Sequence, residues 1–149
     1  MYYKQLSYKL LFFLTFSAVT SCNIPKDPED SWEDIQKNGL QIGVIVNPPY
    51  TIQQNSFFSG TEIELIQNFS SENKLQSRYI SGNETDLTDK LENYEIDILL
   101  GGFTKKSIWS KKVGLTTPYD NEDHVFLIPK GENKLLHNLE SFIFKNKRK

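Results

Sequence analysis

Few residues of this 149-residue sequence have the types and spacing that catalysis or metal binding requires. The only two histidines, His124 and His137, have no cysteine or carboxylate cluster around them, so they do not form a metal-binding pattern. Ser107 and Ser110 lack the neighbouring histidine and aspartate that would activate a hydroxyl nucleophile. The glycine pair at residues 101–102 lacks the spacing of a phosphate-binding loop. We therefore expect no catalytic residue, no metal and no cofactor.

The residue with the clearest chemical role is Cys22, the only cysteine. It follows a segment with two lysines and an apolar run over residues 10–19, which is the layout of a secretory signal peptide. The stretch Val19–Cys22 resembles a bacterial lipobox, in which the cysteine thiol is lipidated and becomes the new N-terminus. We predict that residues 1–21 are a lipoprotein signal peptide, and that the chain is exported and held by its lipid on a membrane facing the periplasm or the cell exterior. A signal peptide or short anchor that merely contains a cysteine is the alternative.

Composition and length narrow the class of protein. The formal net charge is −2, and removal of residues 1–21 would take away two lysines and leave the chain more acidic. Such a chain has no general attraction for nucleic acid, and the basic run over residues 145–149 is interpreted as a solvated tail. The polar residues 22–30 contain two prolines and are predicted to be a tether between the lipid and the domain. The remaining length suits one domain with its own core.

Three helices are predicted from apolar periodicity and capping signals. Ser31 is the expected N-cap of the first helix. The second has the form of a capping box at Thr61–Glu64, with Glu62 and Glu64 expected to face solvent. The predicted helices are Trp32–Lys37, Thr61–Asn73 and one that begins at Thr85 or Asp86 and extends to about Tyr94.

The predicted strands alternate with these helices. The first, Leu40–Val46, is apolar nearly throughout, as expected for a strand that is buried on both faces. This order predicts parallel strands with right-handed crossovers, so ligands should bind where loops 47–50, 81–83 and 101–104 leave the carboxyl ends of the strands. Asp97 lies in a mostly apolar strand and is expected to hydrogen-bond nearby backbone. The other strands are predicted at Leu75–Ile80, Ile96–Leu100 and His124–Ile128, with a short extended piece at Val113–Leu115.

Five short motifs occur along the chain in a recognisable order: Leu40–Val44, Pro48–Tyr50, Gly60–Leu65, Leu91–Thr104 and Thr117–Tyr119. Together they resemble the family 3 bacterial solute-binding proteins, the periplasmic receptors of amino-acid-type ABC importers. The resemblance covers about residues 31–130. It implies an α/β fold, a single lobe of the periplasmic-binding-protein type II fold, with a mostly parallel sheet flanked by helices. It also implies a small polar solute as ligand.

The resemblance further implies which residues bind the solute. Tyr50 corresponds to an aromatic residue after the first strand, and Thr104 to a threonine that hydrogen-bonds the solute. Gly102 either lets the backbone approach a ligand or only permits a tight turn. Amino-acid binders place an arginine five residues beyond that threonine to grip the α-carboxylate, but this chain has Trp109, with only lysines 105–106 nearby. An ordinary α-amino acid is therefore not the expected ligand. Trp109 is expected either to stack on a ring, a sugar or a cation, or to pack beneath the loop.

The length departs from the resemblance, because family members are about twice as long. Residues 31–130 are predicted to be the first lobe, and residues 131–149 the truncated start of the crossover to a second lobe. Leu135–Phe144 resembles the first element of that second lobe, and its apolar side chains would then be exposed. A lone lobe cannot close around a solute, so a separately encoded second lobe is a candidate partner.

Three functions compete on this basis. The favoured one is a lipid-anchored solute-binding protein of an ABC importer, or its N-terminal lobe, with the permease as partner. The second is a truncated interaction or sensor module, or a decayed relative of the family. The third is an enzyme, because the same fold carries cyclohexadienyl dehydratases. A single lobe does not provide a closed cleft with acid and base groups, so no enzymatic activity is expected.

Overall fold

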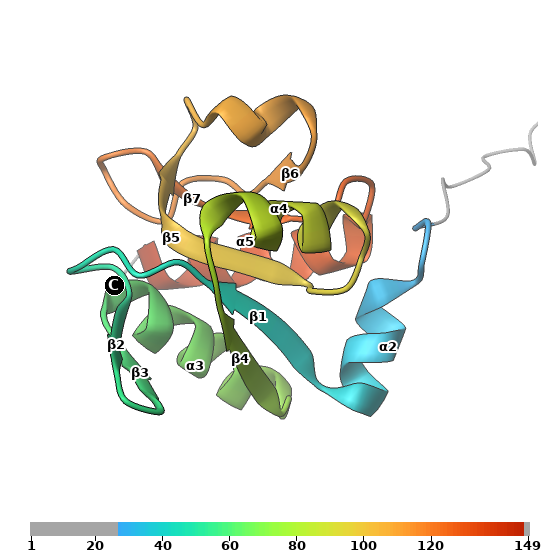
Figure 1. The fold of residues 1–149 in the computed structure, drawn as a ribbon. Coiled ribbons are helices and arrows are strands. Elements are labelled where there is room, and N and C mark those ends of the chain that lie inside the picture. Colours follow the sequence, from blue (N-terminus) through green and yellow to red (C-terminus); the bar gives the residue numbers. More distant parts are fainter. Residues whose placement is uncertain (1–26, 148–149) are drawn as a thin grey trace, which may run out of the picture.

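The computed structural model describes residues 27–147 (Figure 1). Cys22, the predicted signal peptide and residues 22–26 of the predicted tether lie outside the described residues. The helices are α2 (Ser31–Asn38), α3 (Thr61–Asn73), α4 (Glu84–Glu92), the short 3-10 helix η1 (Ile108–Lys111) and α5 (Asn133–Lys147). The strands are β1 (Leu40–Val44), β2 (Ile52–Gln54), β3 (Phe57–Ser59), β4 (Ser77–Ser81), β5 (Ile98–Thr104), β6 (Gly114–Leu115) and β7 (His124–Ile128).

Five strands form the main sheet in the order β4-β1-β5-β7-β6, and β2 and β3 form a separate hairpin. Strand β1 pairs in parallel with β4 and β5, whereas β7 pairs antiparallel with both β5 and β6. The predicted α/β lobe is confirmed, but the sheet is mixed rather than mostly parallel. Strand β5 also continues through the glycine pair, which was expected to end it, as far as Thr104. Its pairing with β7 shifts register between Leu99 and Phe103, and this irregularity accommodates the glycines.

Two apolar cores cover the two faces of the sheet. The larger core packs α2, α3 and α5 against one face, with Ile35, Phe69 and Leu139 among its buried residues. The smaller core packs α4 against the other face through Leu87 and Leu91. Figure 1 shows α3 and α5 on the opposite side of the sheet from α4. Because both faces are covered, the central strand β1 is apolar nearly throughout, as the sequence indicated, whereas the edge strand β4 is mostly polar.

Helix α5 belongs to the larger core of this lobe. Its Leu135, Leu139, Phe142 and Ile143 are buried there, so most of the apolar side chains that were expected to be exposed after a truncated crossover are covered by the lobe itself. Phe144 is 59% exposed, as expected. Along residues 27–147, no helix combines the length and apolar character needed to cross a membrane.

The N-terminal caps of three helices differ from those predicted. Helix α3 begins at Thr61, but Gly60 is its N-cap and no side chain caps it, so the capping box does not form. Asn83, rather than Thr85 or Asp86, caps α4 by accepting a hydrogen bond from the backbone N–H of Asp86 at 2.9 Å. Ser31 lies inside α2, after Asp30.

Candidate functional site

The candidate site lies at the carboxyl ends of β1 and β5, where two of the predicted loops meet. The side-chain amide of Asn47 donates to the carbonyl of Gly101 at 2.8 Å, which ties the first loop to the second. The backbone N–H of Asn47 donates to Thr51 Oγ1 at 2.9 Å, and the Thr51 hydroxyl donates to the carbonyl of Ile45. These bonds close a short turn that presents Tyr50. The predicted approach of loops 47–50 and 101–104 is therefore confirmed.

Gly102 is in direct contact with this turn. Its φ is +69°, a conformation that favours glycine. A Cβ atom at this position would lie 2.5 Å from Cδ2 of Tyr50 and 2.7 Å from Nδ2 of Asn47. The glycine is therefore required for the close approach of the Tyr50 ring to the end of β5.

Glu62 is the buried carboxylate that holds the site together. It is fully buried, and its Oε2 accepts hydrogen bonds from the backbone N–H groups of Gly101 at 2.8 Å and Gly102 at 3.1 Å. Its Oε1 accepts the hydroxyl of Tyr119 at 2.6 Å. Burial raises the pKa of Glu62, and these hydrogen bonds oppose that rise.

The expectation that Glu62 faces solvent was wrong, whereas Glu64 is exposed as expected. Glu62 precedes Ile66 by one helical turn, and this spacing places both residues on the buried face of α3. Periodicity alone could have shown this position to be buried. It could not have shown the partners, because the three donors are brought to Glu62 by β5 and by the segment before β7.

Two tyrosine rings contact the ring of His124, a residue to which the sequence assigned a strand position and no binding role. The ring of Tyr50 lies 4.4 Å from that of His124, and the ring of Tyr119 lies 6.0 Å from it on centroid distances. Nδ1 of His124 lies 2.7 Å from Oδ2 of Asp120, and its backbone N–H donates to Oδ1. Partial burial raises the pKa of Asp120, but hydrogen bonds from His124 and from the backbone of Glu122 outweigh that effect and hold the pKa below its usual value. Asp120 is therefore an ionised carboxylate at neutral pH.

A groove of about 510 Å³ lies between this turn and α3. Two tyrosine rings, Tyr50 and Tyr119, form part of its wall, and three carboxylates, Glu64, Asp120 and Glu122, surround it. The remaining lining residues are Pro49, Thr61, Leu65 and Asn68. The groove is large enough for a small solute.

Thr104 lies beside this cluster, opposite His124 in the pairing of β5 with β7. Its hydroxyl accepts from the backbone N–H of Lys106 at 3.4 Å, and its carbonyl accepts from Ser107. The neighbouring Lys105 forms an ion pair with Asp123 at 3.1 Å. The structure therefore brings Tyr50 and Gly102 into contact, and it places Thr104 next to His124, whose ring Tyr50 contacts.

Trp109 lies on the α4 side of the sheet, away from the α3 groove. It packs against the smaller core, and its indole N–H donates to Oε1 of Glu84 at 2.5 Å. The ammonium of Lys112 lies 5.7 Å from the centroid of the Trp109 ring. Of the two expectations for this residue, the geometry matches packing beneath the loop.

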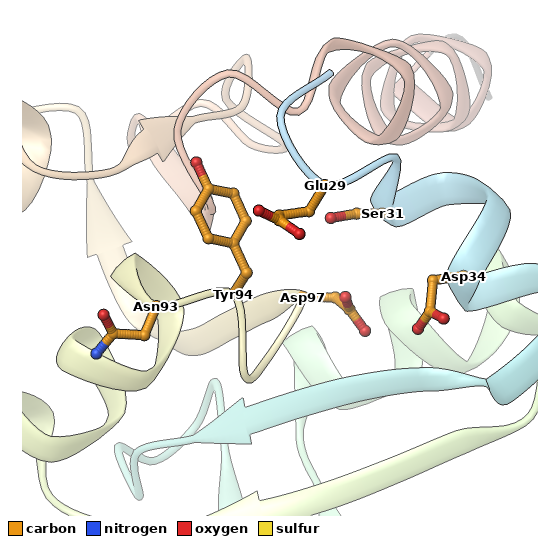
Figure 2. Close-up of a pocket in the computed structure, with 6 residues that line it drawn as sticks. All are labelled: Glu29, Ser31, Asp34, Asn93, Tyr94 and Asp97. Atoms are coloured by element: carbon orange, nitrogen blue, oxygen red, sulfur yellow. The ribbon is translucent and has the colours of Figure 1, made fainter. Parts of the chain in front are cut away.

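A second concavity, of about 400 Å³, lies at the opposite end of the sheet (Figure 2). It is lined by Glu29, Ser31, Asp34, Asn93, Tyr94 and Asp97. Oδ2 of Asp97 accepts from the backbone N–H of Gln41 at 2.7 Å, which confirms its predicted structural role. Burial raises the pKa of Asp97 to about 6. In the described part of the chain, no group of three or more potential ligands is placed to hold a metal ion.

Comparisons with known proteins agree with this architecture. The model of the bacterial extracellular solute-binding proteins, family 3, matches residues 40–148. The arginine-bound form of domain 1 from TmArgBP has a TM-score of 0.69 at 19% identity, over 75% of this chain and 97% of that domain. An ancestral amino-acid-binding protein, described as a precursor of cyclohexadienyl dehydratase, has a TM-score of 0.71 at 13% identity, over 79% of this chain and 94% of that one.

A Salmonella typhimurium periplasmic binding protein with high arginine specificity has a TM-score of 0.65 at 10% identity, over 74% of this chain and 93% of that one. No curated protein matches the sequence significantly. These likenesses show the fold alone, whereas the family model covers most of the chain. The chain therefore belongs to the bacterial extracellular solute-binding proteins, family 3.

Proposed function

We propose that the chain is a lipid-anchored receptor lobe that holds a small polar solute in the groove beside Tyr50. The observation that carries this proposal is the groove itself, about 510 Å³ in volume, at the carboxyl ends of β1 and β5. That end of an α/β sheet is where ligands bind in open α/β folds. Gly102 and Glu62 hold the wall of the groove in place through the contacts described above.

The proposal does not require a second lobe in the same chain. Helix α5 completes the core of this lobe, so the described residues form a unit whose apolar interior is covered. The likeness to an arginine-bound domain 1 supports solute binding by one such lobe. A separately encoded second lobe would strengthen binding, because closing the groove excludes water from its polar contacts.

In the same proposal, Cys22 carries the lipid and the receptor delivers its solute to an ABC permease in that membrane. The chain acts by binding and does not convert the solute. A lipid anchor keeps a receptor beside its permease without a transmembrane helix. The exported, membrane-bound location follows from the signal peptide predicted over residues 1–21.

Solute binding is tested on the mature chain carrying Cys22→Ser, so that no lipid is attached. Thermal-shift screening against amino acids, amines, sugars and nucleosides identifies candidates, and isothermal titration calorimetry measures their Kd. We expect one class to bind and Tyr50→Ala to weaken it at least about tenfold, because the ring forms part of the groove wall. Phe57→Ala is the matched control, since Phe57 is 79% exposed in the β2–β3 hairpin. Binding that survives Tyr50→Ala, or no binding with or without a second lobe, would contradict the proposal.

The anchor is tested in cells by labelling with radioactive palmitate. We expect label on the native chain in the membrane fraction and none on the Cys22→Ser variant. A native chain that is exported without label would retain the receptor proposal but remove the anchor from it.

A further inference from the structure

We infer that the solute of the Tyr50 groove is an organic cation that is recognised without a carboxylate group, such as a free amine or guanidinium compound. This inference rests on the proposed function and adds a ligand class to it. The amino-acid-binding pattern of the family would instead require a positively charged clamp for the α-carboxylate. Three observations on this chain favour the cation.

The first observation is the charge of the groove. Glu64 reaches it from the first turns of α3, while Asp120 and Glu122 reach it from the segment before β7. None of the nine described residues that line the groove is a lysine or arginine. Hydrogen bonds from His124 and from the backbone of Glu122 hold Asp120 in its ionised form. A cation in the groove would therefore meet carboxylates that two separate elements supply.

The second observation is the aromatic wall. The Tyr119 ring is fixed because its hydroxyl donates to Glu62 and its face stacks on Phe126 at 4.9 Å. The Tyr50 ring is fixed by His124 and by the close approach of Gly102. Fixed tyrosine rings attract ammonium and guanidinium groups at little entropic cost. The groove thus combines carboxylates with rings, which is the combination that recognises organic cations.

The third observation concerns the positively charged side chains that could pair with a solute carboxylate. This chain has Trp109 where the resemblance implies a clamp arginine, and its single indole N–H is donated to Glu84 on the α4 side of the sheet, away from the groove. Lys105 is paired with Asp123, and Lys147 donates to the main-chain carbonyl of Asp120. Lys147 therefore brings one ammonium to the margin of the groove, but no lysine or arginine lines it, so a solute carboxylate would mainly face Glu64, Asp120 and Glu122.

The sharpest probe pair is arginine and agmatine, which differ only by the α-carboxylate. Titration calorimetry on the mature Cys22→Ser chain should give a Kd for agmatine at least about tenfold lower than that for arginine, because like charges brought together at an interface are costly. Glutamine should not bind. Agmatine binding should weaken as salt rises, since the contacts are partly exposed.

Variants that remove one negative charge each then test which carboxylates bind the solute. Glu64→Gln and Glu122→Gln should each weaken agmatine binding by about three- to tenfold. The matched control is Glu72→Gln, which removes the same charge from the far end of α3 and should leave the Kd unchanged. Both test residues are exposed, so the fold should be retained.

Two results would overturn the inference. One is arginine binding more tightly than agmatine, which would show that a residue such as Lys106 serves the carboxylate. The other is Tyr50-dependent binding of a neutral or anionic solute, which would leave the proposed receptor function intact and remove only the cation. The absence of any Tyr50-dependent ligand would instead be a failure of the proposed function itself.

Discussion

The carboxylate of Glu62 accepts three hydrogen bonds from groups of the candidate site, two from the backbone of β5 and one from Tyr119. We expect Glu62→Ala to lower the free energy of unfolding by about 3 kcal/mol or more, because three donors lose a buried, charged acceptor. Glu62→Gln keeps an oxygen for the two backbone donors and an amide for the Tyr119 oxygen, so its loss should stay near 1 kcal/mol. Urea unfolding measures both variants, with exposed Glu64→Ala as control. Equal losses for the alanine and glutamine variants would show that the hydrogen bonds contribute little.

Asp97 gives the molecule a pH dependence of defined sign. Burial is the main cause that raises its pKa from 3.8 to about 6, and the hydrogen bond from Gln41 opposes it. The folded chain therefore binds more protons than the unfolded chain between these two values, so the contribution of Asp97 to stability falls as pH rises through that window. We expect Asp97→Asn to be more stable than the parent by about 1 to 3 kcal/mol near pH 8, with no difference near pH 4.

The side-chain oxygen of the asparagine in Asp97→Asn would still accept the backbone N–H of Gln41. The variant therefore removes the titratable charge and keeps the hydrogen bond. Urea unfolding at both pH values measures the difference, and Asp89→Asn on the exposed face of α4 is the matched control. A stability difference that does not change with pH would show that the Asp97 carboxyl titrates as it does in the unfolded chain.

At this scale, sequence reasoning located residues but not their partners. Tyr50 and Gly102 were named from motifs, and the structure brings them into contact. The role of His124 could not be found, because it depends on Asp120 and on two rings from separate segments. Trp109 was noticed only as a departure from a pattern. Its partner Glu84 lies on another helix, which periodicity does not place.

The predicted helices and strands have nearly correct ranges, but the β2–β3 hairpin, η1 and the packing of α5 in this lobe were not predicted. Periodicity shows where a chain buries one face, so α3 and β7 were found directly. Periodicity could not predict the start of α2, because the backbone N–H groups of Glu29 and Ser31 donate to the carboxylate of Glu132. No local pattern reveals a cap that comes from the other end of the chain.

The contact between the segment before α2 and the start of α5 provides a prediction about how the N-terminal segment is held. Asp27 is buried and accepts hydrogen bonds from the backbone N–H groups of Asn133 and Lys134, so it caps α5 while Glu132 caps α2. We expect Asp27→Ala to lower the free energy of unfolding by about 1 to 2 kcal/mol, as the loss of a cap does. Urea unfolding measures it. The exposed neighbour Glu29 provides the control, because Glu29→Ala keeps the backbone N–H that Glu132 binds. A loss no larger than in that control would mean that water replaces the cap.

At the scale of the whole molecule, these caps separate the two ends of the sheet. The N-terminal segment is docked from Asp27 onward beside the amino ends of the parallel strands (Figure 1). The Tyr50 groove lies at the carboxyl ends of β1 and β5. The mixed sheet and the long-range packing of α5 produce this arrangement, and neither follows from local pattern. Only residues 23–26 separate Cys22 from Asp27, and the five steps between their Cα atoms span at most about 18 Å. If Cys22 carries the lipid, the amino end of the sheet should therefore lie near the bilayer and the groove should face away from it.

Fluorescence quenching can measure this orientation, because a lipidated Cys22 leaves no other thiol in the chain. A dye would be attached through Glu95→Cys, just before β5, or through Asn121→Cys, beside the groove, both at exposed positions. With the lipidated chain on vesicles that contain a headgroup quencher, we expect stronger quenching at position 95 than at position 121. A flexible insert of about 20 residues after residue 26 should remove the difference, since such a linker samples many orientations. Equal quenching without the insert would show that the segment before α2 does not orient the lobe, and the groove could then face a permease directly.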